Sequence, residues 1–226
     1  MKRSTVNALI RDAVAFFDEH RFRLPPFAHW APADWPEDRE SVREILDNGL
    51  GWDITDFGQG RFDELGLLLF TVRNGSLSDV GGKTYAEKIM IVNVDQVTPM
   101  HYHWSKTEDI INRGGGTLKI KLFTADPDDG LSGGDVTFST DGVRHRVPAG
   151  HIISLTPGES ITLTPKLYHS FWAVGDRVLT GEVSSVNDDH IDNRFHEPVG
   201  RFPEINEDEP PFRLLVSDYA RCFGNE

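Results

Sequence analysis

The pattern of apolar and polar residues changes once along the chain, near residue 50. In the first 20 residues, apolar side chains recur every three to four positions, as in an amphipathic helix, at Val6, Leu9, Ile10, Ala13, Val14 and Phe17. Ser4 is a candidate N-cap for this helix, and a second short helix is predicted over 41–47. The pattern therefore predicts a helical cap over residues 1–50.

From residue 52 onward the chain consists of short, often β-branched segments separated by Gly, Pro, Asp and Asn clusters. These segments cover 65–72, 88–94, 96–104, 108–112, 117–123, 136–139, 143–147, 151–155, 160–163, 169–174 and 178–186. Asp141-Gly142 lies between two of them and predicts a hairpin turn. Many strands at this close spacing are typical of an antiparallel barrel or sandwich, so the sequence predicts an all-β core.

No internal repeat or linker divides the sequence, which predicts a single domain over residues 1–226. Within it we expect the helical cap at 1–50, the β-barrel at 52–190 and a C-terminal extension at 191–226. The tail over 198–211 is acidic and rich in proline, and we expect it to run as a surface loop. Residues 212–216 are expected to add an edge strand or to pack on the barrel.

Composition narrows the class of partner. The 226 residues include 23 Lys and Arg against 36 Asp and Glu, which gives a net charge of −13 and disfavours binding to nucleic-acid phosphates. No apolar run is long enough for a membrane span, and the N-terminus lacks the pattern of a secretory signal. The single cysteine, Cys222, fits a reducing compartment. We therefore expect a soluble cytoplasmic protein without a membrane partner.

Histidine is the residue type with the most informative placement. His101 and His103 are two positions apart in a predicted strand, so both side chains point to the same face. Glu108 follows after a short turn, and His169 opens a later strand behind a proline-containing hairpin. Three imidazoles and a carboxylate suit a borderline divalent ion such as Mn²⁺, Fe²⁺, Co²⁺, Ni²⁺ or Zn²⁺. Because a structural zinc site would more often use cysteine, we expect an open, catalytic type of site.

A His-x-His pair alone is weak evidence, since chance or two surface histidines explain many such pairs. The added glutamate, glycine triplet and late histidine strengthen the metal interpretation. The remaining histidines are expected to have ordinary structural positions: His20, His29, His145, His151, His190 and His196.

The same residues resemble the cupin superfamily. The spacing His101-x-His103-x4-Glu108-x6-Gly115 matches the first cupin motif, although Asp95 replaces its leading glycine. Gly158, Pro165 and His169 match the second motif loosely. The resemblance implies a cupin-type antiparallel β-barrel, or jelly roll, behind the N-terminal helices.

More specifically, most of the chain resembles the D-lyxose isomerase family of cupin-type sugar isomerases. The resemblance is carried by residues 1–4, 52–58, 85–88, 101–108 and 181–189. It implies interconversion of D-lyxose with D-xylulose, and usually of D-mannose with D-fructose. It also implies a divalent metal, typically Mn²⁺, and a homodimer.

An aldose–ketose isomerase that works through an enediol needs a base near the sugar carbons and an electrophile on the oxygens. Glu182 is the first candidate for the base, because a carboxylate on an otherwise apolar or small strand needs a function or a partner. The polar face that carries Glu182 can point either into the barrel or to solvent. Lys88 is the second catalytic candidate, since the resemblance implies that a lysine at this position lines the active site.

The expected substrate-binding residues are Asp192, Arg194, Trp104 and Lys106. Asp192 and Arg194 lie in a polar segment after the Glu182 strand, where they can bind sugar hydroxyls or simply form a solvated loop. Trp104 can supply an aromatic wall, although aromatic residues on strands more often belong to a core.

Two other functions stay open at this point. One is a different metal cupin enzyme, such as an Fe²⁺-dependent dioxygenase, and the other is a non-catalytic sugar-binding cupin. A phosphorylated sugar would require a basic cluster, and the negative net charge argues against it.

Overall fold

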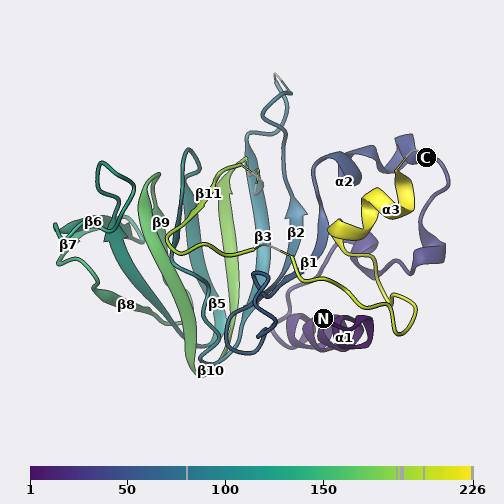
Figure 1. Cartoon of the computed structure of the whole chain (residues 1–226), viewed down its shortest axis with the longest axis horizontal. Helices are drawn as coiled ribbons and strands as arrows, with labels where there is room; N and C mark the ends of the chain where they lie inside the picture. The colour runs from purple at the N-terminus through teal and green to yellow at the C-terminus, as the bar shows by residue number, and fades with distance from the viewer. Residues whose placement is uncertain (80, 187, 189–190, 201, 225–226) are drawn as a thin grey trace.

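The computed structural model describes residues 1–79, 81–186, 188, 191–200 and 202–224. Its main body is a strongly curved antiparallel sheet, with helices gathered at one side (Figure 1). The strands are β1 Gly51–Thr55, β2 Leu67–Arg73, β3 Tyr85–Val92, β4 His101–His103, β5 Glu108–Thr124, β6 Val136–Thr140, β7 Val143–Val147, β8 Ile152–Leu155, β9 Ser160–Leu163, β10 Leu167–Ser185 and β11 Asn193–Phe195. This architecture confirms the predicted all-β core with N-terminal helices.

The helical elements are short apart from the first. They are α1 Arg3–Glu19, α2 Arg43–Asp47 and α3 Tyr219–Phe223, with 3₁₀ turns at Pro26–His29, Pro32–Asp34, Arg39–Val42 and Val216–Asp218. The α1 helix begins two residues earlier than predicted, at Arg3 with Lys2 in place of Ser4 as its N-cap. Ser4 therefore does not cap the helix; its backbone and hydroxyl donate to Asp208 instead. Among the described helices, none combines the length and the apolar character that a bilayer crossing requires.

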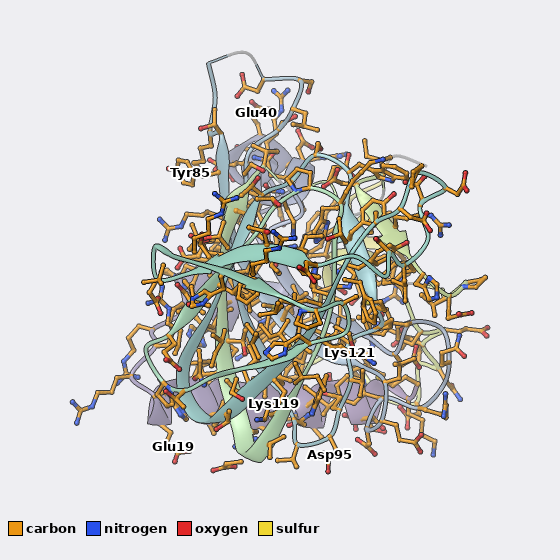
Figure 2. The ribbon with its side chains drawn as sticks, turned by 90° about the vertical axis from the view of Figure 1, so that its left-hand side faces the viewer. Glu19, Glu40, Tyr85, Asp95, Lys119 and Lys121 are labelled. Atoms are coloured by element: carbon orange, nitrogen blue, oxygen red, sulfur yellow. The ribbon has the colours of Figure 1, made fainter. Side chains whose placement is uncertain are left out.

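The sheet runs in the order β1-β2-β3-β10-β5-β9-β6-β7, while β4 pairs with β10 and β11, and β8 pairs with β5. Figure 2 views the molecule from the side: Tyr85 at the start of β3 and Asp95 beyond its end lie at opposite ends of the barrel. The hairpin predicted at Asp141-Gly142 is confirmed, because it joins the paired strands β6 and β7.

Two central strands are longer than the sequence pattern predicted. We expected 108–112 and 117–123 as separate strands, and likewise 169–174 and 178–186, but β5 and β10 each run through. The glycine triplet forms an irregularity between them, where Gly115 adopts φ +93° and an added Cβ would lie 2.1 Å from the Arg177 carbonyl oxygen. Glycine here permits close backbone approach instead of ending the strand.

Strands β1 to β3 separate two apolar layers. Trp52, Phe70 and Ile89 face outward, where they pack with Val6, Ile10 and Phe17 of α1. Leu69 and Met90 face inward, with the core of the barrel. Because side chains alternate along a strand, the outer layer fixes which residues point into the barrel.

The C-terminal tail is tied to the start of the chain. Residues 212–216 form no strand. Leu215 makes a single bridge to Trp52 and is buried in the apolar layer that packs against α1. Arg3 is fully buried and donates to both Glu207 and Asp218 at 2.7–3.0 Å. These hydrogen bonds, with Glu207 first, raise the pKa of the Arg3 guanidinium against the opposing effect of burial.

Replacing Arg3 with alanine tests this connection. The Arg3→Ala variant removes the buried guanidinium that pairs with Asp218 and leaves only the exposed Arg221 beside this carboxylate, so we expect it to lower the free energy of unfolding by about 3 kcal/mol. Urea unfolding followed by far-UV circular dichroism measures the change. Arg43→Ala is the matched control: Arg43 also pairs with two carboxylates, but its side chain is 64% exposed, so its loss should change the stability far less than the loss of Arg3. Equal effects of the two variants would contradict the assignment.

Candidate active site

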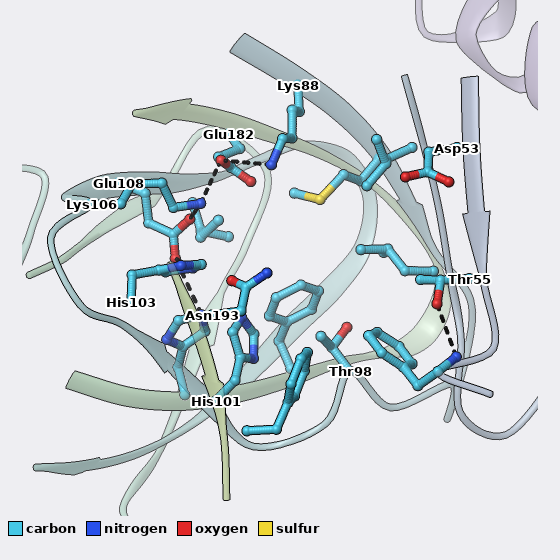
Figure 3. A pocket seen from close by; sticks show the side chains of 18 of the residues that line it. Asp53, Thr55, Lys88, Thr98, His101, His103, Lys106, Glu108, Glu182 and Asn193 are labelled. Atoms are coloured by element: carbon cyan, nitrogen blue, oxygen red, sulfur yellow. Dashed lines mark hydrogen bonds and ion pairs between the residues drawn. The ribbon is translucent and has the colours of Figure 1, made fainter. Parts of the chain in front are cut away.

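The barrel encloses one cavity in which most of the predicted chemical residues meet. It contains about 640 Å³ of space not occupied by atoms, part of it open to solvent. Its wall includes the candidate groups Lys88, His101, His103, Lys106, Glu108, His169 and Glu182 (Figure 3).

Two strands position the three histidines. His101 and His103 are alternate residues of β4, and His169 of β10 lies directly opposite His101 in the strand pairing. All three are buried, and one ring nitrogen from each lies within 4.8 Å of the others. This is the geometry of side chains that converge on one small ion.

Hydrogen bonds to the backbone fix the orientation of two of these rings. The Nδ1 atom of His101 donates to the Pro99 carbonyl at 2.7 Å, and Nδ1 of His169 donates to the Leu167 carbonyl at 3.1 Å. With the proton held on Nδ1, the Nε2 lone pair is available to a metal. Burial, and then the neighbouring imidazoles, hold the pKa of His101 well below its usual value. Burial also lowers the pKa of His103, so both rings are in the neutral form that binds metal.

Glu108 completes the cluster from the start of β5. Its Oε1 atom lies 3.3 Å from Nε2 of His103 and 3.2 Å from Nε2 of His169, yet has no hydrogen-bond partner among the described residues. A buried carboxylate oxygen without a donor, facing imidazole nitrogens, is what a cation site requires. Burial favours the neutral acid, but Lys106 and His103 outweigh it and hold the pKa of Glu108 well below its ordinary value. The four residues thus fit a borderline divalent ion.

A chain of buried charges extends from this cluster to the second carboxylate. Lys106 Nζ lies 2.7 Å from Glu108 Oε2 and 2.9 Å from Glu182 Oε1, and Lys88 Nζ lies 3.5 Å from Glu182 Oε1. Glu182 and Lys88 are directly opposite each other on β10 and β3. The polar face of β10 therefore points into the barrel, where Glu182 is held between two ammonium groups (Figure 3).

The four expected substrate-binding residues have different positions. Lys106 lines the cavity, whereas Asp192, Arg194 and Trp104 are not among its lining residues. On β11 it is Asn193 that faces the cavity, and alternation along the strand turns Arg194 away, where it donates to the Phe195 carbonyl. The geometry gives no support for Arg194 as a pocket residue.

Trp104 lies on the outside of the barrel. Its ring is 41% exposed, packs edge-on against Tyr102 and carries the Lys166 ammonium over one face. It does not form the aromatic wall that we expected. Phe171 and Phe195 are the aromatic side chains that line the cavity near the histidines.

Asp192 lies outside the cavity and supports the site through hydrogen bonds. It is buried and accepts hydrogen bonds from the backbone and hydroxyl of Ser105 and from the backbone of Lys106, at 2.7–3.1 Å. Its Oδ2 also lies 3.6 Å from Nδ1 of His103. Asp192 therefore holds the turn that carries Lys106, in place of the sugar contact that we expected.

Sequence reasoning missed the opposite side of the cavity, which includes Asp53 and Thr55 of β1. The alternation Trp52-Asp53-Ile54-Thr55 was the available indication, but the strand is only five residues long. The predicted ordinary position of His190, and the resemblance at residues 187 and 189, lie outside the described residues.

An antiparallel barrel with a His-x-His pair, a glutamate and a later histidine inside it defines a cupin-type protein. Solved structures with this fold include the L-ribose isomerase of Cellulomonas parahominis, at a TM-score of 0.56 and 16% identity, covering 91% of this chain and 98% of that one. The L-ribose isomerase of Geodermatophilus obscurus gives 0.54 and 14%, covering 90% and 98%. Because the sequence identities are this low, the structural similarity shows a shared fold.

Sequence comparison gives the family. A family model described as D-lyxose isomerase matches residues 1–219. The chain is 52% identical to a D-lyxose/D-mannose isomerase of Serratia proteamaculans, over 98% of this chain and 99% of the relative. It is 50% identical to a D-lyxose/D-mannose isomerase of Escherichia coli O157:H7, over the same shares. The chain therefore belongs to the D-lyxose isomerase family, which confirms the resemblance noted from the motifs.

Removing a histidine tests the metal cluster. We expect His103→Ala and His169→Ala each to weaken binding of Mn²⁺ more than about 100-fold, beyond the loss typical of an outer-shell partner. Metal content after dialysis, measured by mass spectrometry, gives the result. His151→Ala is the control, because His151 is exposed on a loop. Full metal content in both the His103→Ala and the His169→Ala variants would contradict the assignment of these residues as metal ligands.

Proposed function

We propose that this chain is a metal-dependent aldose–ketose isomerase that interconverts D-lyxose with D-xylulose and D-mannose with D-fructose. The observation that carries the proposal is the placement of Glu182 in the same cavity as a four-residue donor cluster, His101, His103, Glu108 and His169. The names of the two close relatives support the choice of sugars. Family membership favours this reaction over the dioxygenase and the non-catalytic sugar-binding alternatives.

The metal ligands in this proposal are His101, His103, Glu108 and His169. The donor set suits Mn²⁺, which we propose first, and it also accommodates Zn²⁺, Co²⁺, Fe²⁺ or Ni²⁺. A divalent ion held by these four residues would supply an electrophile for the carbonyl and hydroxyl oxygens of the sugar and would stabilise negative charge on them. The protein supplies the orientation, through the backbone hydrogen bonds of His101 and His169.

Glu182 is the proposed base. Its carboxylate takes the proton from C2 of the aldose, which breaks the C2–H bond and gives an enediol, and then returns a proton to C1 of the ketose. Ser184 and Lys106 donate to the same Glu182 oxygen, at 3.2 and 2.9 Å, and this fixes the carboxylate in the cavity. Lys88 is proposed to transfer the accompanying proton between the two sugar oxygens.

The same proposal extends to assembly and location. We propose that the chain works as a homodimer, which the family resemblance supports. We also propose a cytoplasmic location, which the single free cysteine, Cys222, supports.

The Glu182→Gln variant tests the base directly. Glutamine preserves the shape of the side chain but cannot accept the proton, so we expect kcat to fall by about 10²–10⁴-fold while Mn²⁺ content stays at the wild-type level. Ketose formation from D-lyxose and from D-mannose, measured on metal-loaded protein, gives the rates. Glu87→Gln is the matched control. Glu87 precedes Lys88 on β3, and its carboxylate pairs with Arg73. Its rate should stay within about twofold of wild type.

Turnover in D₂O adds a second readout. If Glu182 transfers a proton, wild-type protein incorporates deuterium at C1 of the sugar during isomerisation. Product without deuterium indicates direct hydride transfer between the carbons, and unchanged turnover in Glu182→Gln removes this residue as the base.

A further inference from the structure

The side of the cavity opposite Glu182 has no role in the reaction proposed above, yet it carries a buried carboxylate. Asp53 of β1 is only 7% exposed and lines the cavity together with Thr55, the next residue on the same face (Figure 3). A carboxylate on the wall of this cavity is a candidate contact for the polar groups of a bound ligand.

Strand register places Asp53 far from the reacting groups. Glu182 is on β10 and Asp53 is on β1, three strands away in the order β1-β2-β3-β10. At the usual spacing between strands, this is a separation of about 14 Å along the sheet. Leu69 lies directly opposite Asp53 on β2, and Met90 lies opposite Leu69 on β3. The cavity thus has two polar ends joined by an apolar floor.

This arrangement suits an extended sugar chain. The carbonyl end belongs at the metal cluster and Glu182, and the carbon backbone then crosses Leu69 and Met90 towards Asp53. The group that reaches Asp53 is the terminal hydroxymethyl group of the sugar. A carboxylate is a strong acceptor for such a hydroxyl, and charge-assisted hydrogen bonds are the stronger class.

Asp53 also lies at the junction of two hollows. A second, larger basin on the β1–β2 side is lined by Asn48, Thr71, Asn74 and Ser76, and it shares Asp53 and Phe202 with the inner cavity. A sugar that enters through this basin passes Asp53 before it reaches the metal cluster. Its position is therefore suited to selecting which terminal group is admitted.

We propose that Asp53 is a specificity-determining residue that accepts a hydrogen bond from the terminal hydroxyl of the sugar and disfavours sugars phosphorylated there. A phosphate brings almost two negative charges next to the carboxylate. Among the described residues that line the inner cavity, the two lysines are both engaged with Glu182 and neither is on β1 or β2. The inference rests on the proposed isomerase function and adds the part of the substrate that is recognised.

The test compares D-mannose with 6-deoxy-D-mannose, which lacks only the terminal hydroxyl and still forms the six-membered ring. In wild-type protein we expect kcat/KM for the deoxy sugar to be lower by about tenfold or more, the usual effect of losing a hydrogen bond to a charged group. In Asp53→Asn and Asp53→Ala the ratio between the two sugars should shrink to within about threefold. The variants should also turn over D-mannose 6-phosphate better, relative to D-mannose, than wild type does.

Asp47→Asn is the matched control, because Asp47 lines the outer basin but not the inner cavity. It should keep the wild-type ratio. Mn²⁺ content and thermal unfolding show whether each variant is folded and loaded.

Equal kcat/KM for the two sugars in wild-type protein overturns the inference, even if the Asp53 variants fail to fold. A tenfold ratio that persists in a folded Asp53 variant also overturns it. In both cases D-mannose is still isomerised, so the proposed function stands. Wild-type protein that isomerises neither sugar contradicts the proposed function, and with it this inference.

Discussion

The site depends on charge compensation inside an apolar barrel. Glu108 and Glu182 are both almost completely buried, and neither would be stable there as an isolated carboxylate. Lys106 lies between them at 2.7 and 2.9 Å, and Lys88 adds a second positive charge beside Glu182. Because one ammonium contacts both carboxylates, the metal cluster and the proposed base are held in a fixed relation. Asp192, outside the cavity, fixes the turn from which Lys106 reaches in.

One strand provides most of this geometry. β10 carries His169 opposite His101 of β4, and further along it carries Glu182 opposite Lys88 of β3. A one-residue shift of β10 would turn both side chains out of the cavity. The outer layer of Trp52, Phe70 and Ile89 against α1 resists such shifts in the neighbouring strands, since any shift would expose large apolar side chains. The N-terminal helix, and the C-terminal tail that Arg3 binds through Glu207 and Asp218, therefore stabilise the strand register of the site without lining the cavity.

The convergence of His101, His103 and Glu108 was predictable from sequence because these residues are close in the chain and follow strand periodicity. His101 and His103 share a face by alternation, and Glu108 follows one turn later. Glu182 was predictable as a candidate because a carboxylate is unusual on an otherwise apolar strand, whereas Lys88 was a candidate through the family resemblance. Their direct pairing was not predictable, since it depends on the register between β3 and β10.

The other differences have specific physical causes. Asp192, Arg194 and Trp104 were expected near the sugar on the basis of polarity and aromatic character alone, but the direction of each side chain depends on how β4 and β11 pair. Asp53 was not predicted as a site residue because β1 is short and distant in sequence from the histidines. The continuous β5 and β10 were divided in the prediction, because glycine usually marks the end of a strand and here marks close backbone contact.

In the proposed reaction, one cavity brings a metal held by four residues and the Glu182 carboxylate to the same end of a sugar. A crystal structure of Mn²⁺-loaded protein with D-fructose, using anomalous scattering to locate the metal, tests it most directly. We expect one ion bound directly by donor atoms of His101, His103, Glu108 and His169, with Glu182 against C1 and C2 of the sugar. An ion at other residues, or a sugar bound with its C1 and C2 away from Glu182, would contradict it.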